Sequence, residues 1–174
     1  MVESTNKRKQ IKENLIKMAD DLVAKFDTLK LVMEDKELEY EARQTWQGDG
    51  PVTIIKYNAK GFTKEHWNKW AEDPVGVQAA TNDMITQTRL PDEDGHPTWH
   101  LHMKMPMMIS NRSVVISFYE EELSDGSKIL INSSQGNEEV IAAQKEKLIK
   151  KNVVANAIIT YTKGEFYEGG TRMT

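Results

Sequence analysis

The spacing of apolar residues near the start of the chain predicts a long amphipathic helix. Over residues 6–34, apolar side chains recur every three or four positions, with charged residues between them. They form one stripe, which consists of Ile11, Leu15, Met18, Leu22, Phe26 and Leu29. Such a stripe packs against a sheet or a partner. We expect it to pack on the chain's own sheet, and the alternative is a helix that docks on another protein.

The rest of the chain is dominated by strand-like segments separated by turn residues. A first hairpin is predicted from strands at 38–47 and 52–57 around the Gly- and Pro-containing turn 48–51. The further predicted strands are 83–90, 98–105, 112–122, 127–134, 152–161 and 171 onward, with a polar hairpin loop at 91–95. This run of strands predicts an antiparallel sheet.

Two shorter helices are expected among the strands. Thr63 can cap a helix that runs to Trp70, because its hydroxyl accepts a hydrogen bond from an otherwise unpaired backbone N–H. Residues 138–150 have an irregular apolar side and are also predicted to form a helix. The order of helix, two strands, short helix and antiparallel strands is typical of an α+β fold with a curved antiparallel sheet.

Composition narrows the classes of function. The 174 residues suit an N-terminal amphipathic helix at 1–36 and one domain at 37–174. The net charge of -4 does not favour nucleic-acid binding. The sequence has no cysteine, which excludes disulfides and thiol nucleophiles and is compatible with the cytoplasmic location that we expect. No apolar run approaches the roughly 18–20 residues that span a bilayer, so we expect at most peripheral membrane contact.

The stretch 104–115 carries the most informative pattern, between two predicted strands. Pro106 cannot donate to a strand ladder, and Ser110 and Asn111 can bond their own backbone in a turn before a β-branched run resumes. This pattern resembles the central signature of START (StAR-related lipid transfer) domains, which belong to the Bet v 1-like helix-grip superfamily. The matching positions are Lys104, Pro106, Ser110, Asn111, Arg112, Val114 and Val115. Two features depart from the family pattern: Ser113 stands where Asp is usual, and Met107-Met108 replace Trp-Pro.

Three later stretches extend this resemblance in the family's order. Residues 129–134 are similar to its strand ending in Ser-Ser, 153–156 to its Val-Arg-Ala strand, and 168–174 to its turn into a Thr-rich strand. The resemblance implies a helix-grip fold, in which a curved sheet wraps around a helix and leaves an apolar cavity. Family members end in a long C-terminal helix, whereas this sequence stops at Thr174. We therefore expect a START-like domain that is incomplete at its C-terminus: either the sequence is truncated, or the N-terminal helix or a protein partner covers the sheet in place of the missing helix.

Side-chain alternation along the central strands identifies a candidate ligand wall. In a strand, every second side chain points to the same face. The predicted wall consists of Trp99, Leu101, Met103, Met105, Val114, Ile116, Phe118, Ala157, Ile159 and Tyr161. The alternative is that these residues only pack the core. Arg112 is a candidate contact for a lipid headgroup, although a structural role is the favoured interpretation.

Metal and catalytic chemistry have little support in the sequence. His100 and His102 lie on one strand face with a spacing that can bind a metal, but no third ligand is evident, and we expect a solvated or partner-facing pair. The sequence has no nucleophile elbow, P-loop or H-E-x-x-H motif. We therefore predict no metal, no cofactor and no enzymatic activity.

The favoured function is binding, with transfer as an extension, of a lipid or other hydrophobic small molecule. One alternative is a structural or scaffolding subunit that uses the START-like fold as a protein-interaction module. In that case a protein partner would cover the sheet or the N-terminal helix. The remaining alternative is a cyclase/aromatase-like enzyme, which would need polar groups inside the cavity.

Overall fold

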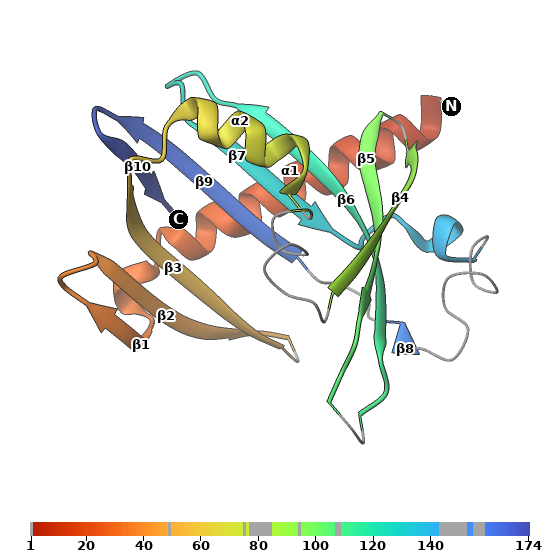
Figure 1. The fold of residues 1–174 in the computed structure, drawn as a ribbon, viewed down its shortest axis with the longest axis horizontal. Coiled ribbons are helices and arrows are strands. Elements are labelled where there is room, and N and C mark those ends of the chain that lie inside the picture. The colour runs from red at the N-terminus through yellow and green to blue at the C-terminus, as the bar shows by residue number, and fades with distance from the viewer. Residues whose placement is uncertain are drawn as a thin grey trace. The chain divides into compact units, whose positions relative to one another are not determined.

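A computed structural model describes residues 2–48, 50–74, 76, 85–93, 95–106, 109–142, 153–154 and 159–174 (Figure 1). The elements are α1 (Val2–Val23), the 3-10 helix η1 (Phe26–Thr28), β1 (Lys30–Asp35), β2 (Tyr40–Gln47), β3 (Gly50–Lys60), α2 (Lys64–Glu72), β4 (Ile85–Glu93), β5 (His96–Met103), β6 (Arg112–Glu122), β7 (Lys128–Ser133), β8 (Val153–Val154), β9 (Ile159–Tyr167) and β10 (Gly170–Met173). The strand order is β1-β2-β3-β10-β9-β7-β6-β5-β4, and the short β8 lies parallel to β6. The predicted α+β class with a curved antiparallel sheet and an N-terminal helix is confirmed.

The N-terminal helix is shorter than the sequence predicted. It ends at Val23, and Leu29 already has an extended backbone with φ -80° and ψ 159°. The expectation of helix over 24–34 is wrong because Phe26 is buried from the single turn η1, and the next residues pair with β2. Cross-strand pairing therefore overrides the helical spacing of Phe26 and Leu29.

Most other elements lie where the sequence placed them, with shifted ends. β6 occupies the predicted residues, whereas β4 continues to Glu93 and takes in much of the expected 91–95 loop. Residues 138–142 are helical, and 143–150 lie outside the described residues. The single strand expected at 152–161 is two strands, β8 and β9, with 155–158 outside the described residues.

The chain divides into two compact units, each assembled from three segments. Unit 1 comprises 1–12, 69–119 and 131–160. Unit 2 comprises 13–68, 120–130 and 161–174. The division at residue 36 expected from the sequence stays a prediction.

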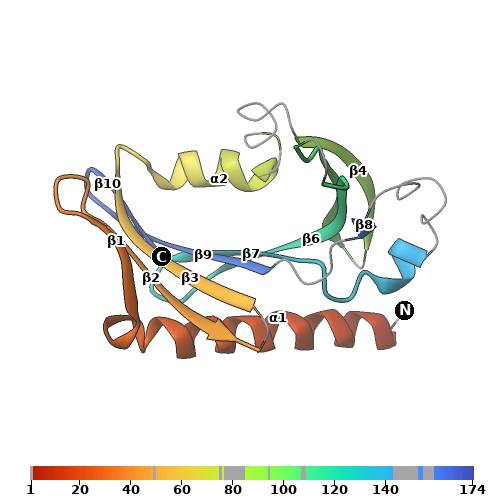
Figure 2. The ribbon, with the colours of Figure 1, turned by 90° about the horizontal axis from the view of Figure 1, so that it is seen from below.

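The core of unit 2 forms where the end of α1 meets β3. Leu22, Phe26 and Ile54 are buried together there, and Met18, Val23, Leu29 and Val52 pack around them. Figure 2 shows α1 and α2 on opposite sides of β3 and β10. Burial of this part of the apolar stripe confirms that α1 packs on the chain's own strands.

The other face of unit 2 is organised by Trp67 of α2, which is fully buried. Its ring meets Phe166 of β9 edge-on, with ring centroids 5.9 Å apart, and its Nε1 donates to Glu120 Oε1 at 3.2 Å. A Cβ at Gly164 would lie 2.6 Å from Trp67 Cζ3, so only glycine leaves room for the ring. Thr63 Oγ1 accepts from the His66 backbone N–H at 3.4 Å, as expected for the residue before the helix.

Candidate functional site

Strand register in unit 1 brings part of the predicted wall onto one face. Trp99 lies opposite Ile116, and Leu101 lies opposite Val114. Directly opposed residues in an antiparallel pair point to the same side of the sheet. With Phe118, two residues beyond Ile116, they form a surface that we call the apolar face, defined by Trp99, Leu101, Val114, Ile116 and Phe118. All are buried except Trp99, which is half-buried.

The neighbouring strand β4 adds polar groups to the same face. Gln87 lies opposite Leu101, and Arg89 lies opposite Trp99 with its guanidinium carbon 5.0 Å from the ring centroid. Gln87 Oε1 and Trp99 Nε1 are both buried without a hydrogen-bond partner within the described part of the chain. The apolar face therefore carries one unsatisfied acceptor and one unsatisfied donor. Gln87 was not anticipated from the sequence, because a polar residue in a strand is usually assigned to the solvent side.

Of the remaining predicted wall residues, Met103 lies on the same side of β5 as the apolar face, opposite Arg112, and is half-buried. Met105 is half-buried and follows the end of β5. Ala157 and the side chain of Ile159 lie outside what the structure describes. Tyr161 belongs to unit 2, where burial raises the pKa of its hydroxyl and the nearby Asp20 carboxylate raises it further.

Residues of the START-like signature shape the connection between β5 and β6. Arg112 Nη1 donates to the Ser110 carbonyl at 2.6 Å, and Asn111 Oδ1 accepts from the Met105 backbone N–H at 3.0 Å. Residues 110 and 111 themselves have no turn or other regular structure, and Asn111 bonds the backbone of Met105 rather than its own neighbours. A headgroup contact for Arg112 stays a prediction.

The opposite face of the same strands is buried and polar. His100 is only 6% exposed, and burial lowers its pKa, with a further lowering from His102. The expectation of a solvated histidine pair is therefore wrong for His100, because it lies opposite Val115 in the interior of the β5–β6 pair. Among the described residues, no group of three potential ligands is placed to hold a metal.

A buried arginine lies on this polar face and was not anticipated. Arg8 of α1 is 4% exposed and donates to Ser117 Oγ, Tyr119 Oη and Asn137 Oδ1, each at 3.2 Å. Ser117 Oγ also lies 2.9 Å from Thr98 Oγ1. The sequence position of Arg8 could have indicated its burial. Arg8 precedes Ile11 and Leu15 at helical spacing, so it lies on the same side of the helix as the apolar stripe.

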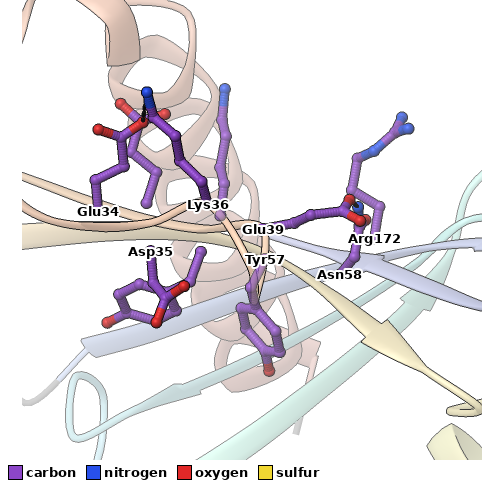
Figure 3. Close-up of a pocket in the computed structure, with 10 residues that line it drawn as sticks. Glu34, Asp35, Lys36, Glu39, Tyr57, Asn58 and Arg172 are labelled. Carbon is purple, nitrogen blue, oxygen red and sulfur yellow. Dashed lines mark hydrogen bonds and ion pairs between the residues drawn. The ribbon is translucent and has the colours of Figure 1, made fainter.

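Unit 2 contains a polar hollow of about 450 Å³ near the β1–β2 hairpin (Figure 3). Figure 3 shows Glu34 and Lys36 on one side of the strands and Tyr57 on the other. Burial raises the pKa of Tyr57. Lys36 pairs with Glu34 at 4.0 Å, and Arg172 pairs with Glu165 at 3.7 Å. Charges of both signs make this hollow unsuited to an apolar ligand.

Comparison of the sequence with protein-family models and with curated proteins gives no match. Comparison with solved structures gives clear matches. A STAR-related lipid transfer protein from Xanthomonas axonopodis (fragment 25-204) is 14% identical with a TM-score of 0.65, over 83% of this chain and 77% of that chain. The human StarD13 (DLC2) lipid transfer and protein localization domain is 13% identical with a TM-score of 0.57, over 91% of this chain and 78% of that chain.

These comparisons establish the fold. The chain has a START-like helix-grip fold, as the signature at 104–115 implied. None of the described helices is long and apolar enough to cross a membrane.

Proposed function

We propose that this protein binds a lipid or another hydrophobic small molecule at the apolar face of unit 1, without catalysing a reaction. The observation that carries the proposal is the apolar face itself, built by β5 and β6 within a START-like fold. Because four of its five side chains are already buried, the gain on binding would come from the ligand's own apolar surface leaving water, which contributes about 25 cal/mol per Å². Transfer of the ligand between membranes and a cytoplasmic location stay predictions.

Gln87 and Trp99 suggest how the ligand would be oriented. Their buried Oε1 and Nε1 atoms lack partners, and a buried polar group left unsatisfied costs about 1–3 kcal/mol. A ligand with a polar end that both donates and accepts a hydrogen bond would satisfy the two atoms. We therefore propose that the ligand's polar end lies between Gln87 and Trp99.

The first test is native mass spectrometry of the purified full chain, with organic extraction of anything bound. We expect a co-purifying lipid, or a complex after incubation with a mixed lipid extract. A chain that stays empty in both conditions would refute ligand binding.

Two substitutions test the orientation. Gln87→Leu and Trp99→Phe each remove one of the unsatisfied atoms, and Gln87→Leu keeps the side chain's bulk, whereas Trp99→Phe puts a smaller ring against Arg89. We expect unchanged or higher stability of the empty chain for Gln87→Leu, because an unsatisfied buried group is lost. We expect ligand affinity to fall roughly five- to thirtyfold, because one hydrogen bond to the ligand is lost.

Matched controls come from exposed residues of the same types in β2. Trp46 is 66% exposed and Gln47 is exposed, so Trp46→Phe and Gln47→Leu should change neither stability nor affinity appreciably. Ligand binding that is unaffected by Gln87→Leu and Trp99→Phe would remove the proposed orientation and leave ligand binding itself in place.

A further inference from the structure

The side of unit 1 that carries the apolar face is arranged in three rows across β4, β5 and β6. Side chains in one row lie opposite one another and point to the same side of the sheet. The three rows are Arg89 with Trp99 and Ile116, Gln87 with Leu101 and Val114, and Ile85 with Met103 and Arg112. Gln87 and Trp99 are therefore diagonal neighbours in adjacent rows, close enough for long side chains to contact the same group.

The two unsatisfied atoms on this face have opposite requirements. Gln87 Oε1 can only accept a hydrogen bond, and Trp99 Nε1 can only donate one. A hydroxyl group meets both requirements at one oxygen, because it has one O–H and two lone pairs. An ionised carboxylate only accepts, so it leaves Gln87 Oε1 unsatisfied. An ammonium group only donates, so it leaves Trp99 Nε1 unsatisfied.

The two arginines on this side of the strands already have partners. Arg89 forms an ion pair with Asp92, and its guanidinium lies over the Trp99 ring. Arg112 donates to the Ser110 carbonyl, and it lies two rows from Trp99, which is about 13 Å along the strands. A charged group placed between Gln87 and Trp99 would therefore lose its hydration without gaining an unpaired opposite charge.

We infer that the polar end of the ligand is an uncharged hydroxyl group, as in a long-chain alcohol, and that the site disfavours fatty acids and amines. This inference rests on the proposed function and adds the chemical class of the ligand to it. The hydroxyl donates to Gln87 Oε1 and accepts from Trp99 Nε1. The apolar part of the ligand lies along the remaining side chains of the apolar face.

The experiment compares four ligands that share a decyl chain and differ at the polar end. Decanol, decyl methyl ether, decanoate and decylammonium are titrated into the lipid-free full chain at pH 7.5 and followed by calorimetry. We expect decanol to bind roughly tenfold more tightly than each of the others, because each of them leaves one of the two buried atoms unsatisfied. The ether is the closest match, since it accepts from Trp99 Nε1 but cannot donate to Gln87 Oε1.

Variants of the two residues assign the preference to them. Gln87→Leu should bring the affinities of decanol and the ether to within about twofold, because the acceptor that distinguishes the two ligands is gone. Trp99→Phe should weaken both ligands to a similar extent, since both accept from Nε1. Gln47→Leu, at an exposed position of β2, should keep the wild-type preference.

The wild-type chain alone can overturn the inference. Equal binding of decanol and the ether, or tighter binding of decanoate or decylammonium, would do so and would leave ligand binding itself in place. A preference for decanol that survives Gln87→Leu would also overturn it, because the hydroxyl would then bind elsewhere. A chain that binds none of the four ligands would overturn it as well, and native mass spectrometry with organic extraction then shows whether the proposed function also fails.

Discussion

His100 couples the stability of unit 1 to pH. Its ordinary pKa is 6.5, and burial, together with His102, lowers that pKa in the folded chain. Between the two pKa values, the unfolded chain binds a proton that the folded chain does not bind. The free energy of unfolding therefore falls as the pH drops through 6.5, and it continues to fall until His100 is protonated in the folded chain as well.

We predict a lower free energy of unfolding at pH 5.5 than at pH 7.5, measured by urea denaturation. His100→Gln should reduce this pH dependence, because glutamine does not titrate. His66→Gln should keep it, because His66 is exposed on α2. Hydrogen bonds from Lys64 and Ser127 lower the pKa values of Glu122 and Asp125, so stability from these carboxylates is lost only at more acidic pH. An unchanged pH dependence in His100→Gln would contradict the assignment.

At the scale of elements, the contact between α2 and β9 depends on the absence of a side chain at Gly164. A Cβ there would lie 2.6 Å and 2.8 Å from Cζ3 and Cε3 of Trp67, whose ring is fully buried. We predict that Gly164→Ala lowers the free energy of unfolding by about 1–3 kcal/mol, because the ring or the strand must shift. Urea denaturation measures the change.

Gly50→Ala is the matched control, since a Cβ at this strand glycine meets nothing within 4 Å. Its effect should stay within about 0.5 kcal/mol. Equal stability of the two variants would mean that Trp67 is not held against β9 as the structure has it.

Some elements could be predicted from the sequence, and others could not. β6 could be predicted closely, because its run of β-branched and aromatic residues is bounded by clear turn residues. The end of α1 could not be predicted, because Phe26 and Leu29 keep helical spacing after the chain has left the helix. The unsatisfied Oε1 of Gln87 could not be predicted either, because it depends on the register between β4 and β5, which no local sequence pattern encodes.

At the scale of the whole molecule, each unit is assembled from segments that are distant in the sequence. In unit 1 the three segments meet at one side chain. Arg8 comes from 1–12, its acceptors Ser117 and Tyr119 from 69–119, and Asn137 from 131–160. Alternation and periodicity describe each segment separately, so they predict the apolar face but not this three-way junction.

The hydrogen bonds of Arg8 lead to a final prediction, which concerns the stability of unit 1. Arg8→Met keeps the length of the side chain but leaves the buried oxygens of Tyr119 and Asn137 without their guanidinium donor. We predict that it lowers the free energy of unfolding by about 2–4 kcal/mol, the range for breaking a buried hydrogen-bond network. Lys17→Met, at an exposed position of the same helix, should change it by less than about 0.5 kcal/mol. Hydrogen exchange should also become faster in β6 after Arg8→Met, because the junction restrains that strand. If both variants were equally stable, the three segments of unit 1 would be held together by apolar packing alone, and Arg8 would be a buried charge without structural effect.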